Sequence, residues 1–354
     1  MSTWPDTRIL ELLGIELPII QGPLANATST AMVIAVNQAS ALGSMPAAAL
    51  TIEHLREALS IIRQASTRPL NVNFFCHQPP APDADRDLQW KKLLEPYYRE
   101  LGADFDAPTP VSNRAPFNNA ACEVVEEFRP EVVSFHFGLP EKSLLDRVKA
   151  TGAKVLSSAT TVEEAIWLEQ HGCDAVIAMG SEAGGHRGMF LSDDLNSQIG
   201  TMALVPQVVD AVRVPVIAAG GIGDARGIVA AFALGASAVQ IGTAYLFTPE
   251  ANVSKSHHHA LRNAQASETA LTNLFTGRPA RGIINRVMRE LGSINPTAPA
   301  FPLSGGALIP LKAKDEAGFS NLWSGQALRL GKDISTYDLT LELAALALEK
   351  LSRR

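Results

Sequence analysis

Short apolar runs alternate with longer amphipathic segments over the first two-thirds of the chain. Eight of these runs are nearly continuous in apolar residues, as in strands that a parallel sheet buries on both faces. They lie at residues 18–21, 41–45, 70–75, 132–137, 154–158, 174–178, 215–219 and 236–241. Helical patterns lie between them, and the clearest spans residues 52–65, where Leu55, Leu59 and Ile62 recur at spacings of three and four after a Thr51 N-cap. Further helices are predicted at 31–39, 88–101, 141–150, 162–170, 202–212, 225–234 and 339–351.

This order of elements predicts an α/β protein with eight β/α units, which close naturally into a TIM-like (β/α)8 barrel. A doubly wound open sheet is the alternative. The barrel is favoured because glycine-rich segments follow strands throughout the chain, the seventh and eighth included. A doubly wound sheet would concentrate its glycine motif at the first turn.

Two regions depart from the alternation. Residues 79–120 are rich in proline and aspartate around the predicted helix 88–101, and they read as an insertion after the third strand. Residues 246–354 show no clear strand and several helical stretches. We therefore expect a barrel over residues 1–245 and a smaller, mainly helical C-terminal extension over residues 246–354 that covers the barrel mouth.

Composition and charge narrow the partners. The 354 residues carry a formal net charge of −6 without a basic run, so a nucleic-acid partner would lack its main source of affinity. Cys76, Cys122 and Cys173 are widely separated, which suits a reducing cytoplasm and favours neither a disulfide framework nor a zinc site. No apolar run is long enough to cross a bilayer, and the first residues lack a secretory pattern. We expect a cytoplasmic protein that does not bind a membrane.

The densest candidate for chemistry is the segment Met179–Gly188 after the sixth predicted strand. Its four glycines let backbone amides approach a ligand, and it contains one imidazole, that of His186. In a barrel this segment lies at the C-terminal face, where active sites are built. His136 ends the fourth predicted strand and would face the same mouth. A lone histidine is usually structural, but two at different strand ends favour a functional site.

Two more glycine-rich segments, 218–224 and 240–244, follow the seventh and eighth predicted strands. Barrels commonly bind a phosphate with these two loops. Glycines that only make tight turns are the alternative, but the combination favours a phosphate-bearing cofactor. The sequence shows no second glycine motif for an adenylate group. Gly22 and Pro23 after the first strand, and Asn73 on the third, would also face the mouth.

Two other features carry less weight. The tract His257-His258-His259 would diverge around a helix by about 100° per residue, so we interpret it as a solvated surface and predict no metal site. Lys312 offers a cation for an acidic substrate, although a surface lysine is the simpler interpretation.

Taken together, these segments resemble the FMN-dependent nitronate monooxygenases, formerly called 2-nitropropane dioxygenases. The similarity covers most of the barrel, and its most specific parts are Gly180–Gly188, Ala218–Asp224 and Gln240–Thr243. The resemblance implies catalytic roles for His186 and His136. It implies flavin-ring contacts for Gln21, Gly22, Pro23 and Asn73, and contacts to the ring, ribityl chain and phosphate for Gly184, Gly221, Gln240, Gly242 and Thr243. Met179 stands where relatives often have a glutamine that contacts FMN, so a side-chain hydrogen bond is lost there. The segment 301–312 also lacks the tyrosines that line the substrate pocket in some members.

The resemblance implies oxidation of alkyl nitronates by O2 to a carbonyl compound and nitrite, with propionate 3-nitronate as one substrate of the family. The alternative is an NADH-dependent flavin reductase of the enoyl-thioester or quinone type, because those barrels carry a similar histidine loop. A non-catalytic binding barrel fits less well, since it would have little use for the histidine. The sequence leaves open whether the enzyme is a monomer or a homodimer.

Overall fold

The computed structural model describes residues 4–112 and 114–353. Its core is an eight-stranded parallel sheet with the strand order β1-β9-β8-β6-β5-β4-β3-β2. Backbone hydrogen bonds join Gln21 and Ile19 of β1 to Leu42, one residue before β2, and so bring the two edges of the sheet together. The predicted TIM-like barrel is confirmed. The strands are β1 (Ile19–Gln21), β2 (Gly43–Pro46), β3 (Leu70–Phe75), β4 (Val132–His136), β5 (Lys154–Ala159), β6 (Ala175–Met179), β8 (Val216–Ala219) and β9 (Ala238–Ile241).

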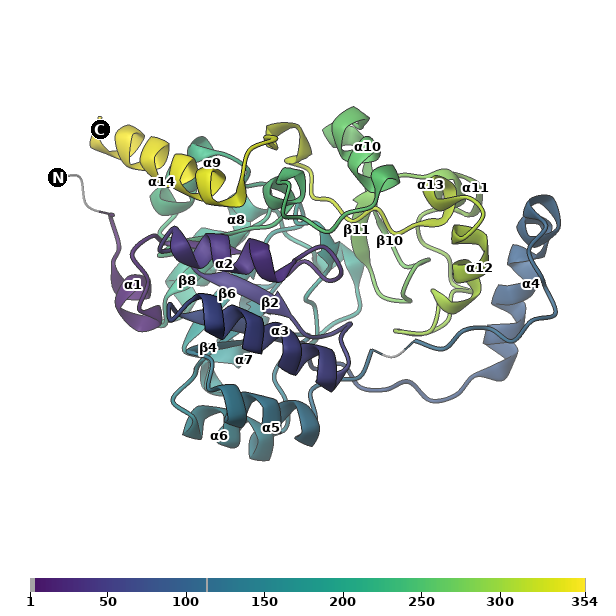
Figure 1. Cartoon of the computed structure of the whole chain (residues 1–354), viewed down its shortest axis with the longest axis horizontal. Coiled ribbons are helices and arrows are strands. Elements are labelled where there is room, and N and C mark those ends of the chain that lie inside the picture. The colour runs from purple at the N-terminus through teal and green to yellow at the C-terminus, as the bar shows by residue number, and fades with distance from the viewer. Residues whose placement is uncertain (1–3, 113, 354) are drawn as a thin grey trace.

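Helices surround this sheet (Figure 1) because each one buries an apolar face against it. They are α2 (Thr30–Gln38), α3 (Ile52–Ala65), α5 (Asn119–Phe128), α6 (Lys142–Ala150), α7 (Val162–Gln170), α8 (Thr201–Ala211) and α9 (Ala225–Ala233). The short helix α1 (Arg8–Leu13) packs Ile9 and Leu13 against the first residues of the strands, among them Val132 and Ala175. This helix therefore closes the N-terminal end of the barrel and leaves the opposite end for a site.

The C-terminal helix α14 (Thr336–Ser352) packs against α2 and α9 on the outside of the barrel. Its Leu339, Leu343 and Ala347 join the same apolar core as the barrel helices. In Figure 1 it lies far from the other C-terminal helices. It therefore does not belong to the cover that the sequence predicted over the mouth. It takes the place of the helix that follows the eighth barrel strand.

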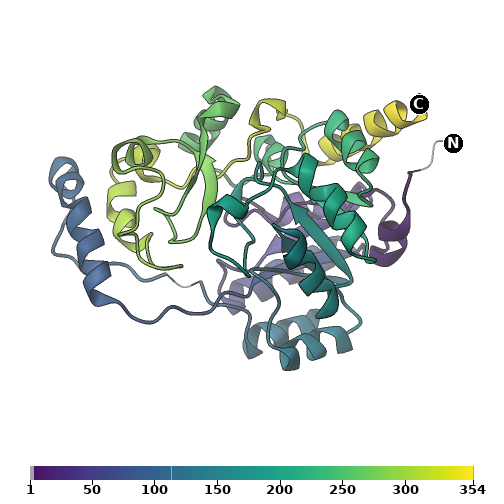
Figure 2. The same ribbon diagram turned by 180° about the vertical axis from the view of Figure 1, so that it is seen from behind.

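A second, smaller body is built from two distant parts of the chain, and both views show them side by side (Figures 1 and 2). Helix α4 (Ala84–Leu101), from the predicted insertion, packs Trp90, Leu94 and Tyr98 against residues 274–319. The Trp90 indole also donates a hydrogen bond to the Ser304 carbonyl at 3.0 Å. The other helices of this part of the chain are α10 (Lys255–Asn263), α11 (Arg286–Leu291), α12 (Ile309–Lys312) and α13 (Glu316–Phe319).

The expectation of no strand after residue 245 is wrong. Strands β10 (Thr269–Thr272) and β11 (Ala280–Ile283) form an antiparallel pair, and β11 continues onto β7 (Gly185–His186). Each has four residues. Strand β10 mixes Thr with Ala and Leu, and β11 mixes Arg and Gly with Ala and Ile, so neither produces the continuous apolar run that marks the barrel strands. The part remains mainly helical, as predicted, and the domain division near residue 245 stays a prediction.

No helix in the described residues has the length and apolar character that a membrane span requires.

Candidate active site

A cavity of about 350 Å³ opens at the C-terminal ends of the barrel strands. The strand ends and the loops that follow them line one side of it, and residues 312–327 of the smaller body line the opposite wall. Every residue that the sequence assigned to the site lines this cavity, with Gln21 as the exception. Gln21 is fully buried below the cavity, where its amide donates to Thr28 Oγ1 and its carbonyl oxygen accepts from the Ser44 amide. Its side chain therefore holds β1 to its neighbours.

The loops after β8 and β9 present free backbone donors to the cavity. Gly221 has φ +70°, a conformation that glycine adopts without strain. The amides of Gly221 and Thr243 donate no hydrogen bond to another part of the described chain. A Cβ at Gly242 would meet only Leu24 Cδ2, at 3.4 Å, so a side chain there would extend into the cavity. Close approach of a ligand to these two loops is therefore possible only because both positions are glycine.

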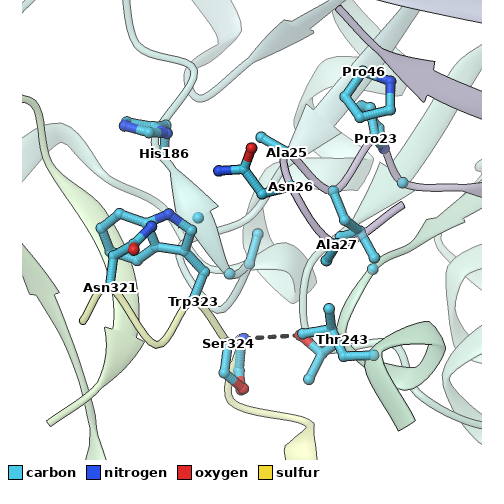
Figure 3. Close-up of a pocket in the computed structure, with 18 of the residues that line it drawn as sticks. Pro23, Ala25, Asn26, Ala27, Pro46, His186, Thr243, Asn321, Trp323 and Ser324 are labelled. Carbon is cyan, nitrogen blue, oxygen red and sulfur yellow. Dashed lines mark hydrogen bonds between the residues drawn. The ribbon is translucent and has the colours of Figure 1, made fainter. Parts of the chain in front are cut away.

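Gly184 has a different reason for being glycine. A Cβ there would lie 2.5 Å from the amide nitrogen of Gly325, so the histidine loop and the segment Ser324–Gly325 pack backbone against backbone. The Gly325 amide also donates to Thr243 Oγ1 at 2.8 Å (Figure 3). The loop after β9, the loop after β6 and the smaller body therefore meet at one point of the cavity wall.

Polar and soft side chains from the strands themselves form the cavity floor. Asn73 donates from Nδ2 to Ser134 Oγ at 2.9 Å, which orients its amide. Gln240 on β9 lines the same floor, and its side chain has no hydrogen-bond partner among the described residues. Met179 lines it with a thioether, which donates no hydrogen bond.

The loop that carries His186 is fixed from below by a buried arginine. Arg187 donates to the carbonyls of Gly180 and Met179, both at 2.6 Å, and to Gln198 Oε1 at 2.7 Å. Burial lowers the pKa of its guanidinium to about 10. Since the guanidinium faces two strand-end carbonyls, it anchors the loop at the end of β6.

His136 uses both ring nitrogens inside the protein. Nε2 lies 3.1 Å from the carbonyl oxygen of His186, which only accepts, so this nitrogen carries the proton. Nδ1 then accepts from the Ser158 hydroxyl at 2.6 Å. Burial lowers the pKa of His136 to about 3. Both ring nitrogens of His136 are therefore bonded within the protein, and the ring orients the backbone of His186. A catalytic role for His136 stays a prediction.

The ring of His186 lies in an aromatic enclosure at the cavity wall. The rings of Phe75, Phe137, Phe301 and Trp323 surround it at centroid distances of 5.3–6.0 Å. Nε2 lies 2.9 Å from Thr276 Oγ1, whereas Nδ1 has no hydrogen-bond partner among the described residues. His186 therefore has one nitrogen turned toward the protein and one available to a ligand.

Cations dominate the surroundings of His186. Burial, and after it the neighbouring Arg114, His136 and Arg278, hold the pKa of His186 well below its ordinary value. The Arg278 guanidinium lies over the Phe137 ring, 4.3 Å from its centroid, and Arg114 lines the cavity. The pKa of Arg114 is lowered, and burial is the sole cause, so no described carboxylate neutralises it. A neutral imidazole beside an unbalanced cation favours an anionic ligand.

Sequence reasoning missed several lining residues. Arg114 follows the inserted helix, and Trp323 stands in a loop far along the chain, so neither lies at a strand end where a motif could mark it. Figure 3 shows Trp323 and His186 on the same side of the cavity. The interpretation of residues 257–259 as a solvated surface is wrong for His257. This side chain lines the cavity, and its Nε2 donates to the Trp323 carbonyl at 3.0 Å. The helix α10 did rotate the three imidazoles apart, as expected.

Comparisons with known proteins agree with this geometry. The family model described as nitronate monooxygenase matches residues 6–345. A nitronate monooxygenase of Paraburkholderia phytofirmans is 38% identical, with 95% of this chain and 93% of the relative covered. A solved structure of nitroalkane oxidase from Streptomyces ansochromogenes has 35% identity and a TM-score of 0.86, with 98% and 99% covered. A structure of FabK from Thermotoga maritima is more distant, at 27% identity and a TM-score of 0.75, with 99% and 98% covered. The chain is an oxidoreductase and belongs to the nitronate monooxygenase family.

Proposed function

We propose that this enzyme uses FMN to oxidise alkyl nitronates with O2 to a carbonyl compound and nitrite, and that propionate 3-nitronate is among its substrates. The observation that carries the proposal is the environment of His186. Its Nδ1 is free toward the cavity, and the charges that act on it come from Arg114 and Arg278. An anion such as a nitronate is the ligand that this arrangement suits.

The cavity fits FMN on the evidence of its glycines and amides. The family is a family of flavoproteins, and the FMN assignment rests on the single phosphate site that the loops of Gly221 and Gly242 can form. Both loops offer unpaired amides and space that a Cβ would fill. We assign the ring to the floor around Gly22, Pro23, Asn73 and Gln240, where polar side-chain atoms are available. Bound there, FMN would supply the redox chemistry that transfers electrons from the nitronate to O2.

The protein's own groups supply position and charge. We assign the removal of the α-proton of a neutral nitroalkane to Nδ1 of His186, in a ring that burial keeps neutral by lowering its pKa. A preformed nitronate needs no base, and Arg114 balances its charge. The aromatic rings around His186 exclude water and so strengthen both interactions.

Lys312 offers a second positive charge for an acidic substrate, away from the reacting centre. It is exposed at the outer rim of the cavity, in the wall that the smaller body contributes. We propose that its ammonium group attracts an acidic nitronate to the entrance. Direct contact at the reacting centre is assigned to Arg114, which lies among the charges that act on His186.

Small molecules are the only partners that we propose, namely the nitronate or nitroalkane and O2. The proposal includes no nucleic acid and no membrane, and either a monomer or a homodimer would accommodate the site. A cytoplasmic location is proposed because the three cysteines are free thiols, which a reducing compartment preserves.

The visible spectrum of the purified protein tests this function. We expect a bound flavin that acid precipitation releases with the mass of FMN, and anaerobic addition of a nitronate should bleach it. Anaerobic addition of NADH tests the alternative function, an NADH-dependent flavin reductase. Rapid bleaching by NADH but not by nitronate would refute nitronate oxidation in favour of that reductase, and a colourless protein that cannot be reconstituted with FMN would refute both.

A further inference from the structure

The hydroxyl group of Thr276 makes the closest polar contact to the ring of His186. Its Oγ1 lies 2.9 Å from Nε2, and Thr276 is 2% exposed. The same hydroxyl lies 3.4 Å from the carbonyl oxygen of Arg278, a long contact in which the carbonyl only accepts. A buried hydroxyl has one proton to donate. If that proton points to Arg278, the hydroxyl must accept from the imidazole.

We propose that Thr276 is a positioning residue for catalysis, which accepts the Nε2 proton of His186 and so keeps the lone pair on Nδ1, toward the cavity. This proposal rests on the proposed function and deepens it. A neutral imidazole carries its proton on either nitrogen, and only one of the two forms places an unprotonated nitrogen toward the substrate. The partner of the inner nitrogen therefore decides whether the outer nitrogen can act as a base.

The smaller body brings Thr276 to this place and holds it there. Strand β11 pairs Ala280 with His186 and Arg281 with Gly185, and the Arg187 amide donates to the Pro279 carbonyl at 2.9 Å. The neighbouring Gly277 has φ +93°, and a Cβ there would lie 2.3 Å from the Pro299 carbonyl oxygen. The turn that carries Thr276 therefore has little freedom, which a group that orients a catalytic ring requires.

The remaining groups around the ring support the same assignment. His136 donates its Nε2 proton to the carbonyl of His186, so it fixes the main chain and leaves both ring nitrogens of His186 untouched. The charged or titratable groups that face His186 are Arg114, Arg278, His136 and His77. The pKa of each of these histidines is lowered by burial. Since the structure gives Nε2 only one partner among the described residues, Thr276 alone can select the tautomer.

The test compares Thr276→Val, which removes the hydroxyl at nearly constant shape, with Thr276→Ser, which keeps it. We expect the valine variant to lose about 10–100-fold in kcat/KM on a neutral nitroalkane, a range typical of lost second partners of metal-bound histidines. Turnover of the preformed nitronate should change much less, because it needs no base. The serine variant should restore the nitroalkane reaction.

Thr272→Val is the matched control in the same segment. The Thr272 hydroxyl accepts from the Leu274 amide at 3.2 Å and makes no contact with His186. Its loss should lower thermal stability without changing the ratio of nitroalkane to nitronate turnover. An equal change in that ratio for both valine variants would show that Thr276 acts only as part of the turn, and would overturn the proposal.

The tautomer of His186 can be measured without any substrate turnover, so the role of Thr276 can be tested independently of the proposed function. Nitrogen-15 spectra of histidine-labelled holoenzyme distinguish protonated from unprotonated ring nitrogens, and His186→Asn identifies the signals of His186. We expect a proton on Nε2 in the native enzyme and a mixture of tautomers in Thr276→Val. A proton on Nδ1 in the native enzyme would refute the proposal even if nitronates are oxidised. The spectrum of the native enzyme tests the role of Thr276 even if nitronates are not oxidised. It also does so if the valine variant does not fold.

Discussion

At the scale of single residues, the site separates two histidines that look alike in the sequence. His136 has both ring nitrogens bonded within the protein, whereas His186 leaves Nδ1 free toward the cavity. Both end or follow a barrel strand, so their positions alone could not distinguish them. The difference comes from Ser158, a hydroxyl residue that no motif marks, which bonds Nδ1 of His136, whereas no described residue bonds Nδ1 of His186.

The first prediction concerns His186→Asn. If Nδ1 removes the α-proton, turnover of a neutral nitroalkane should fall by about 10²–10⁴-fold, the usual range for a lost general base. The preformed nitronate should be affected far less, and the flavin spectrum should not change. Steady-state kinetics on both substrates give the result. His54→Asn, an exposed histidine on α3, is the control and should leave both rates unchanged.

The pH dependence of the native enzyme follows from the same residue. Burial lowers the pKa of His186 well below the ordinary histidine value of about 6.5, so the folded enzyme keeps this group neutral above that pH. Acid protonates the base, so its contribution to the rate is lost only as the pH falls below the lowered pKa. Nitroalkane turnover that rises steeply between about pH 6 and 7 would contradict an unprotonated His186 at neutral pH.

At the scale of elements, the predictable part of the molecule is the barrel. All eight barrel strands were predicted from their apolar runs, because burial on both faces leaves a strong local signal. The strands β7, β10 and β11 were not, since two-residue and four-residue strands with mixed side chains leave almost none. Helix α5, which follows the insertion, was also missed.

The site divides in the same way. Glycine loops at strand ends could be recognised because their spacing along the chain repeats with the barrel. Arg114, His257 and Trp323 reach the cavity only through the packing of the smaller body, which no local pattern encodes. The flavin contact of Gln21 stays a prediction. Its side chain is buried outside the cavity lining and bonds to Thr28 and to the Ser44 amide.

The second prediction tests the loop after β9 through Gly242→Val. Gly242 has φ −109°, which valine adopts, and the new side chain would enter the cavity where we assign the phosphate. The variant should be folded but colourless, as circular dichroism and acid-released flavin would show. Gly184→Ala is the comparison, because its Cβ would collide with the Gly325 amide and disturb docking of the smaller body instead. Full flavin content in Gly242→Val would show that this glycine serves only the backbone turn and does not make room for the phosphate.

At the scale of the whole molecule, the barrel carries the glycine loops of Gly221 and Gly242, and the smaller body completes the cavity wall opposite them. Helix α4 and residues 274–319 form one apolar cluster, although more than 170 positions separate Leu101 from Leu274 along the chain. Thr276 and Trp323 belong to this body, and both lie against His186. The position of Thr276 and Trp323 therefore depends on packing against helix α4, which itself does not line the cavity.

The third prediction follows from this dependence and concerns Trp90→Ala. Trp90 is 1% exposed and donates to the Ser304 carbonyl, so its removal leaves a large cavity between α4 and the C-terminal helices. A buried tryptophan replaced by alanine typically costs about 3–5 kcal/mol. Leu88→Ala, on the same helix at a side chain that is 50% exposed, is the control and should change stability by less than about 0.5 kcal/mol.

The loss should be local, because the cofactor loops of Gly221 and Gly242 belong to the barrel and the Trp90 cluster does not include them. We expect Trp90→Ala to retain its flavin while amide hydrogen exchange accelerates over residues 269–283, the strands and turn that carry Thr276. Nitroalkane turnover should then fall more than nitronate turnover, since the base loses its positioning partner first. Uniformly faster exchange in barrel and smaller body, with flavin lost in proportion, would instead show that the two parts unfold as one unit and that helix α4 has no separate effect on His186.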